Sequence, residues 1–130
     1  MTLEGKKIAI LLAPRGTEEP EFSEPKHAVE AAGASVTVVG VEAGEVQTVN
    51  NDLNPGSIFS VDKAVAEVSA SDFDGLVIPG GSVGADTLRG NEQIVSFVHD
   101  FFTQQKPVGV SRQIVVDDRH FRNSGNRDLK

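Results

Sequence analysis

Residues 75–78 read GLVI and run directly into Pro79-Gly80-Gly81. A short, continuous apolar run of this kind is typical of a strand that is buried on both faces of a sheet. The two glycines permit a tight turn after the strand. The residues beyond the turn are predicted to be helical, with the main part of the helix at residues 92–105. A buried strand followed by a glycine turn and a helix predicts a parallel sheet with helical connections.

Three other stretches carry the same strand signature, namely residues 7–13 (KIAILLA), 35–41 (SVTVVGV) and 107–110 (PVGV). Residues 22–32 are predicted to be a helix, with Pro25 in its first turn and Gly33 as its C-terminal cap. This alternation predicts a doubly wound α/β fold with right-handed crossovers, in which the first and third strands are parallel neighbours.

The segment between the second and third strands is expected to leave the central sheet. Residues 46–49 and 57–61 have strand character and flank the turn-rich sequence NNDLNPG, which favours a hairpin or excursion. Residues 62–68 are predicted to form a short helix.

Composition excludes several classes of protein and of functional site. The chain has 130 residues, which predicts one domain. Its formal charge of −7 and pI near 4.8 would repel phosphate backbones, so we expect no nucleic-acid binding. It contains no cysteine, which excludes disulfides, thiolate metal sites and cysteine nucleophiles in these residues. No apolar run approaches the ~20 residues of a membrane-spanning helix, and the first residues resemble a strand rather than a signal peptide. We therefore expect a cytoplasmic protein without membrane contact.

Two loops at the carboxyl ends of predicted strands hold the candidate site, because ligands of doubly wound folds bind at that edge. The first loop contains Glu18, Glu19 and Glu21 at a helix N-terminus, where the helix dipole favours carboxylates. The run alone favours solvated side chains. The alternative is that one carboxylate, best placed at Glu21, turns inward, acquires a raised pKa and acts as a general acid or base.

The second loop contains Gly80 and Gly81. Either these glycines form only a tight strand-to-helix turn, or their N–H groups bind an oxyanion or a phosphate. The sequence departs from both the P-loop and the dinucleotide-binding pattern. His27, His99 and His120 have no metal-ligand spacing, and Ser111 lacks the Gly-x-Ser-x-Gly elbow of serine hydrolases. We therefore expect neither a metal nor a cofactor.

The residues from KKIAILLAPRGTEEPEFSEPKHAVEAAGASVTVV through SASDFDGLVIPGG to FFTQQKPVGV closely resemble the ThiJ/PfpI superfamily, in its PfpI-like branch, over about residues 6–110. The resemblance implies a flavodoxin-like sandwich that assembles as a homodimer or larger oligomer. It also implies a stress-response peptidase or deglycase that acts on peptides or small carbonyl adducts. In that chemistry a reactive cysteine on a strand-to-helix elbow is activated by a glutamate, here Glu21. The N–H of Gly81 belongs to the family's oxyanion hole.

The sequence departs from the family after residue 110. The family continues Ile-Cys-His-Gly-Pro, whereas this chain continues Ser111-Arg112-Gln113, so that Arg112 stands where the nucleophile should be. Residues 1–109 hold 7 basic and 16 acidic side chains, but residues 110–130 hold 5 and 3, so the composition changes at the same point. Both an internal deletion and a frame change fit this change. We divide the chain into a ThiJ/PfpI-like domain at residues 1–110 and an atypical tail at residues 111–130.

Two functions follow as expectations. One is a stress-response protein of the PfpI type whose cysteine chemistry is lost, because arginine cannot replace a thiolate. The other is a non-catalytic binding or oligomerisation module on the same scaffold. A third hypothesis, a small-anion site on the Gly80-Gly81 loop, rests on that loop alone. Loss of the elbow helix is expected to expose apolar sheet surface and to promote association.

Overall fold

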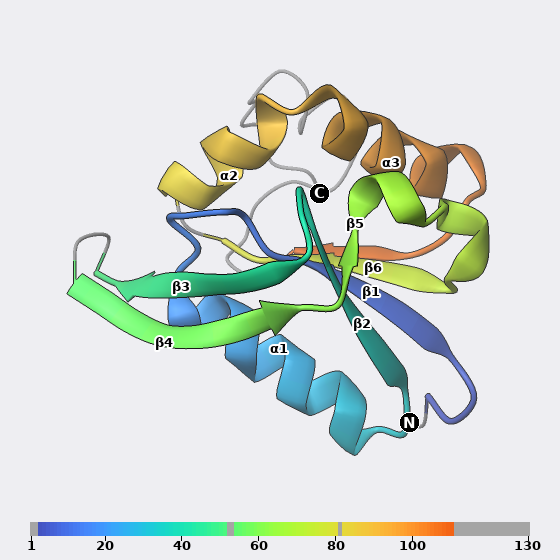
Figure 1. Cartoon of the computed structure of the whole chain (residues 1–130). Helices are drawn as coiled ribbons and strands as arrows, with labels where there is room; N and C mark the ends of the chain where they lie inside the picture. Colours follow the sequence, from blue (N-terminus) through green and yellow to red (C-terminus); the bar gives the residue numbers. More distant parts are fainter. Residues whose placement is uncertain (1–2, 52–53, 81, 111–130) are drawn as a thin grey trace.

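A parallel sheet lies at the centre of the computed structural model, which describes residues 3–51, 54–80 and 82–110 (Figure 1). Its strand order is β5-β2-β1-β6-β7. The bounds are β1 (Lys7–Leu11), β2 (Ser35–Gly40), β5 (Lys63–Ala64), β6 (Gly75–Ile78) and β7 (Val108–Val110). Strand β1 pairs in parallel with both β2 and β6, which confirms the predicted α/β class and the predicted neighbours.

Helices cover both faces of this sheet (Figure 1). Helix α1 (Glu19–Ala31) lies on one face, and α2 (Ser82–Arg89) and α3 (Glu92–Thr103) lie on the other. Alternate residues of β1 point to opposite faces. Ala9 and Leu11 therefore join the cluster under α3, whereas Ile10 packs with Phe22 of α1. The apolar run at residues 7–13 reflects this burial on two sides.

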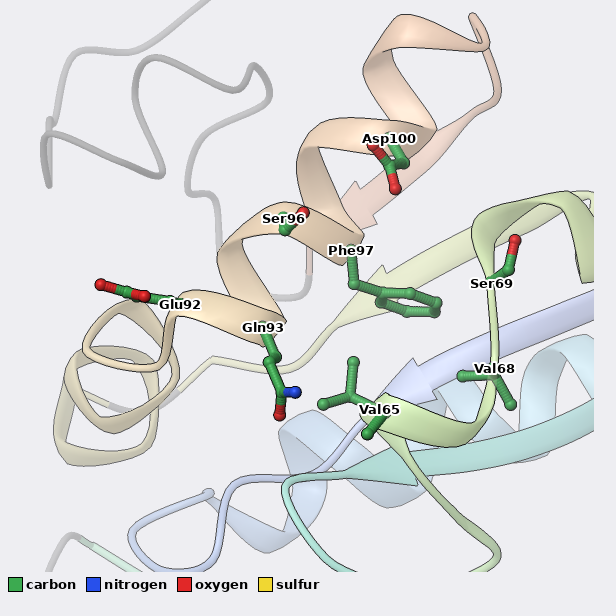
Figure 2. Close-up of a pocket in the computed structure, with 9 residues that line it drawn as sticks. Val65, Val68, Ser69, Glu92, Gln93, Ser96, Phe97 and Asp100 are labelled. Carbon is green, nitrogen blue, oxygen red and sulfur yellow. The ribbon is translucent and has the colours of Figure 1, made fainter.

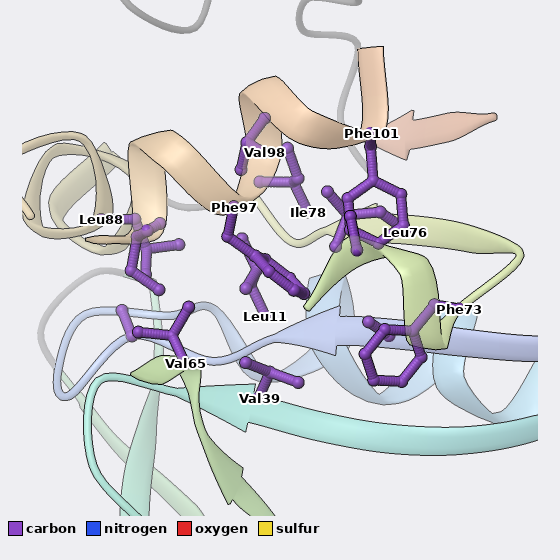
Figure 3. Packing of buried hydrophobic residues seen from close by; sticks show 14 residues of the cluster. Leu11, Val39, Val65, Phe73, Leu76, Ile78, Leu88, Phe97, Val98 and Phe101 are labelled. Carbon is purple, nitrogen blue, oxygen red and sulfur yellow. The ribbon is translucent and has the colours of Figure 1, made fainter. Parts of the chain in front are cut away.

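Aromatic rings fill the space between α3 and the sheet (Figure 3). Phe97 and Phe101 of α3 are in edge contact, with ring centroids 5.1 Å apart. Phe73, just before β6, lies 6.2 Å from Phe97 and 6.4 Å from Phe101. These three rings fix α3 against the sheet, because offset and edge-to-face pairs stabilise beyond the burial of their area.

The predicted hairpin is present between β2 and β5. Strands β3 (Gly44–Asn50) and β4 (Asn54–Val61) pair antiparallel and extend beside the central sheet (Figure 1). The short helix predicted at residues 62–68 is wrong. Asp62 accepts the N–H of Val38 at 2.8 Å, and the next two residues pair with β2. The rest of the segment forms the 3₁₀ turn η1 (Val65–Glu67), and a second 3₁₀ turn, η2 (Ala70–Asp72), follows it.

Helix α1 differs from prediction at its start. It begins at Glu19 rather than at residue 22, so Pro20 occupies the first turn and Pro25 is the seventh helical residue. The prediction that Pro25 lies in the first turn is therefore wrong, because the acidic residues before it already belong to the helix. The helix ends as predicted, with Gly33 at a φ of 102°.

Large hydrophobic side chains in the described part of the chain are mostly enclosed. Ile58 of β4 is the exposed exception there, at 60%. The extensive apolar surface expected from loss of the elbow helix is thus not seen in residues 3–51, 54–80 and 82–110. No helix in these ranges is both long and apolar enough to cross a membrane.

Candidate functional site

The two predicted site loops meet at one edge of the sheet. The loop before α1 follows β1, and the glycine turn follows β6, so both lie at the carboxyl ends of adjacent parallel strands. The N–H of Gly84 in α2 donates to the carbonyl oxygen of Gly16 at 3.1 Å, which joins the two segments directly. The shared edge is the place where doubly wound folds bind ligands.

Gly84 permits this contact because it has no side chain. A Cβ at this position would lie 2.9 Å from the carbonyl oxygen of Gly16 and 3.0 Å from its carbonyl carbon. Gly84 is the third residue of α2. The glycine-rich sequence therefore serves helix-to-loop packing as well as the turn itself.

Thr17 fixes the loop between β1 and α1. Its side chain is buried, and its Oγ1 accepts the N–H of Ala13 at 3.2 Å. Its carbonyl accepts the N–H of Val49 in β3 at 2.9 Å. The loop is thereby attached to its own strand on one side and to the β3–β4 hairpin on the other.

Glu18 and Glu19 bind the same hairpin. The expectation of solvated carboxylates is wrong for Glu18, which is buried, whereas Glu19 is partly exposed. Glu18 is 8% exposed, and its Oε1 accepts the N–H of Asn51 at 3.1 Å. The Oε1 of Glu19 accepts the N–H of Ser57 at 2.9 Å, and its Oε2 accepts the Ser57 hydroxyl at 3.2 Å. These two side chains hold the hairpin against the start of α1.

The environment of Glu19 favours its charged form. The hydrogen bond from the backbone of Ser57 lowers the pKa of Glu19 most, and side-chain hydrogen bonds from Asn50 and Ser57 add to it, against a smaller effect of burial. Gly56 leaves room for this carboxylate, since a Cβ there would lie 2.8 Å from Glu19 Oε1. A lowered pKa suits a structural anion and not a general acid.

Glu21 is half-buried in the first turn of α1, at the sheet edge that Gly80 also occupies. Gly80 is buried directly after β6. Gly81 and Arg112 lie outside the described residues, as do Ser111 and His120. A cleft that joins Glu21 to the glycine turn therefore stays a prediction, and so do the roles that the family resemblance gives to Glu21 and Gly81.

The described part of the chain contains two histidines. His27 on α1 and His99 on α3 are both exposed, on helices that cover opposite faces of the sheet. Within the described ranges, no three His, Asp or Glu side chains come close enough together to hold a metal ion.

Sequence reasoning missed the partners of the glutamates. Thr48, Gly56 and Ser57 form the other half of the attachment, and the hydroxyl of buried Thr48 donates to the carbonyl of Ser57 at 2.8 Å. The turn-rich NNDLNPG indicated a hairpin but not where it would fold. The sequence offers one weak signal for this contact, which is a run of three carboxylates followed later in the chain by a hairpin that contains glycine and serine.

These observations agree with a comparison against known families. The model of the DJ-1/PfpI family matches residues 6–110. The chain belongs to the DJ-1/PfpI family. The match ends where the sequence begins to depart from the family pattern, and it includes both site loops and the hairpin between them.

The chain matches little more than half the length of its curated relatives in this family. The chain is 40% identical over 103 residues to "Putative cysteine protease YraA" of Bacillus subtilis and 39% identical over 104 residues to that organism's "General stress protein 18". It is 37% identical over 103 residues to "Protein/nucleic acid deglycase 2" of Escherichia coli. These alignments cover 79–80% of this chain but only 57–58% of the relatives.

Solved structures show the same fold. A two-domain protein of Anabaena variabilis with DJ-1/ThiJ/PfpI-like and ferritin-like domains matches with a TM-score of 0.69 and 32% identity, over 81% of this chain and 29% of that one. Oxidized DJ-1 of Toxoplasma gondii matches with a TM-score of 0.71 and 25% identity, over 82% of this chain and 55% of that one. The flavodoxin-like architecture expected from the resemblance is confirmed.

Proposed function

We propose that these 130 residues form a catalytically silent PfpI-type domain, related to stress-response peptidases and deglycases but without their thiol chemistry. One observation carries the proposal, which is that the sequence contains no cysteine. Its one sulfur atom belongs to Met1, a thioether that cannot form a nucleophilic anion. The names of the relatives, a cysteine protease and a deglycase among them, support the family but assign no activity to this chain.

The residues that remain at the sheet edge cannot replace the nucleophile. Glu18 and Glu19 are hydrogen-bonded to the hairpin. Glu21 and the glycine turn correspond to supporting groups in the family, and donors without a nucleophile give only a weak electrostatic acceleration. Small carbonyl compounds or peptides are therefore candidates for binding and not for turnover.

The decisive experiment measures methylglyoxal consumption by the purified chain beside a full-length relative that retains its cysteine. We expect only the background rate. We expect the same from Arg112→Cys, because the residues after position 112 do not match the family's elbow. Turnover comparable to that of the relative would overturn the proposal. If such turnover is lost in Glu21→Ala, the mechanism is cysteine-free and uses Glu21. If turnover persists in that variant, the chemistry takes place elsewhere.

The remaining role on this scaffold is association with a further polypeptide, in the first instance a second copy of the chain. Among the described strands, β7 lies at the end of the sheet and pairs with β6 alone. An edge strand of this kind is able to pair with another chain. Size-exclusion chromatography with light scattering tests the idea, since a purely monomeric protein at high concentration would contradict it.

A further inference from the structure

A cavity of 420 Å³ lies between helix α3 and the segment that carries η1 and η2 (Figure 2). Its volume falls in the ~300–1,000 Å³ range of small-molecule sites. It lies beside β5 and α3, whereas the candidate site described above follows β1 and β6. None of its lining residues belongs to the candidate site loops or to the contacts that hold the β3–β4 hairpin.

One wall of the cavity is apolar and rigid. Val65 of η1 and Phe97 of α3 are each only 4% exposed, and Val68 is half-buried beside them. Phe97 is held by its edge contacts with Phe73 and Phe101. A ligand there meets the half-buried side chain of Val68 and the small exposed part of Phe97, which suits a short aliphatic chain.

The polar part of the lining consists of hydroxyl, amide and carboxylate groups. Asp100 of α3 and Ser69, which precedes η2, stand on opposite walls at one end of the cavity (Figure 2). The hydroxyl oxygen of Ser69 accepts the N–H of Ser71 at 3.1 Å and has a second lone pair. No Lys, Arg or His is among the described residues that line the cavity, and the chain as a whole carries a charge of −7.

We propose that this cavity binds a primary alkylammonium group, with its nitrogen between the Asp100 carboxylate and the Ser69 hydroxyl and its aliphatic chain along Phe97 and Val68. An ammonium has three donors and no acceptor, so it matches a carboxylate and a hydroxyl oxygen. The apolar wall matches the chain that such a group carries. Anionic ligands are disfavoured, since no cation in the lining offsets the charge of Asp100 and Glu92.

Glu92 provides the matched control for Asp100. It also lines the cavity, but its carboxylate is directed away from Phe97 at the other end of the α3 segment (Figure 2). Both side chains are exposed, so neutralising either one leaves the core intact. General attraction of a cation to an acidic surface would respond equally to both substitutions, whereas a site at Asp100 and Ser69 would respond to one.

The experiment titrates n-butylammonium chloride into the isotope-labelled 130-residue chain and follows backbone amide shifts by NMR. We expect saturable shifts at Val68, Ser69 and Phe97 with a dissociation constant on the order of millimolar. Asp100→Asn is expected to weaken binding at least about fivefold, and Glu92→Gln less than about twofold, at ~0.15 M salt where remote exposed charges are screened. n-Butanol, which has the same chain without the charge, should produce no saturable shift.

Two sources of the ammonium group are then distinguished with Nα-acetyl-lysine methylamide. Equal binding of this compound and n-butylammonium would assign the cavity to a lysine side chain of a polypeptide, and binding of n-butylammonium alone would assign it to a free amine. Either result supports the proposal. Equal loss in Asp100→Asn and Glu92→Gln, equal binding of n-butanol, or no saturable shift with either amine would overturn it.

Discussion

The N–H of Gly84 donates a hydrogen bond of 3.1 Å to the carbonyl oxygen of Gly16, so helix α2 starts in contact with the loop that follows β1. This contact links the first site loop, through its backbone, to the helix that follows the glycine turn. No side chain of ordinary size fits between them, because a Cβ on Gly84 would approach the Gly16 backbone to 2.9 Å. Residue 84 therefore requires glycine, although alanine is normally favoured inside a helix.

Gly84→Ala is therefore expected to destabilise the protein by about 1–3 kcal/mol, the usual cost of overpacking. In an unconstrained helix the same change would stabilise by roughly 0.5–1 kcal/mol, so the sign is informative. Urea denaturation followed by circular dichroism measures the difference. Gly90→Ala is the control, since a Cβ there would meet the nearest carbonyl oxygens at an ordinary 3.6 Å. Equal stability of the two variants would show that the contact is not tight.

The sequence predicts the central sheet well because its signal is local. The run at residues 7–13 and the GLVI strand are apolar on both faces, and helices cover both faces in the structure. The carboxylates of the first loop are predicted poorly because their partners are remote. Glu18 and Glu19 bind residues 33 and 38 positions away along the chain, and nothing in a local pattern specifies such a pairing.

Two other errors concern the type or the bounds of a predicted helix. The predicted helix at residues 62–68 failed because pairing with β2 takes the first residues of that segment. The predicted start of α1 lies three residues too late. The prediction places Pro25 in the first turn, whereas Pro20 already occupies that turn. The first error shows pairing with a remote strand overriding local helix propensity, and the second is a misassigned first-turn proline.

The Glu19 attachment predicts a specific acid sensitivity. Its folded-state pKa lies below the ordinary value of 4.5, so its contribution to stability is fully present above that value and is lost as the pH falls through the folded pKa. Glu19→Gln should therefore reduce the decline of stability below about pH 4.5 while lowering stability at neutral pH. Thermal unfolding at a series of pH values measures both effects.

Glu24→Gln is the control for this prediction, because Glu24 is an exposed carboxylate on the same helix. Its pH profile should follow that of the unmodified chain. If Glu19→Gln retains the full acid decline, the charge of Glu19 does not hold the hairpin, and the contact with Ser57 contributes only as a neutral hydrogen bond.

Lys106 connects two stretches that carry the family resemblance. Its ammonium donates to the carbonyl oxygens of Ala70 at 2.8 Å and Phe73 at 2.6 Å, so the lysine before β7 binds the turn before β6. Lys106→Met keeps most of the aliphatic stem but leaves both carbonyls without this donor. We expect a loss of about 1.5–3 kcal/mol, the usual value of a hydrogen bond to a charged group.

The control for Lys106 is Lys63→Met, which removes an exposed ammonium from β5 and should change stability by less than about 0.5 kcal/mol. Chemical denaturation of both variants measures the difference. Equal effects would mean that the loss reflects net charge and not the bonds to Ala70 and Phe73.

Pro25 breaks a local rule beside a candidate site residue. It is the seventh residue of α1 and has no N–H to donate to the carbonyl of Glu21 one turn earlier. A proline inside a helix costs about 3 kcal/mol, and an alanine there regains the donor but loses part of the proline's restriction of the unfolded chain, worth about 0.4–1 kcal/mol. Pro25→Ala is therefore expected to stabilise the protein by about 2–2.6 kcal/mol.

Pro20→Ala separates this effect from a general effect of proline. Pro20 lies in the first turn of α1, where a missing N–H removes no helical bond, so its replacement should be neutral or destabilise by up to about 1 kcal/mol. Denaturation curves of the two variants should shift in opposite directions. Natural proteins retain locally unfavourable residues chiefly at functional sites. A stabilising Pro25→Ala would thus indicate that the first turn, including Glu21, is held in its position at a cost in stability. If Pro25→Ala is neutral or destabilising, the helix accommodates the proline without strain, and the position of Glu21 requires no such cost.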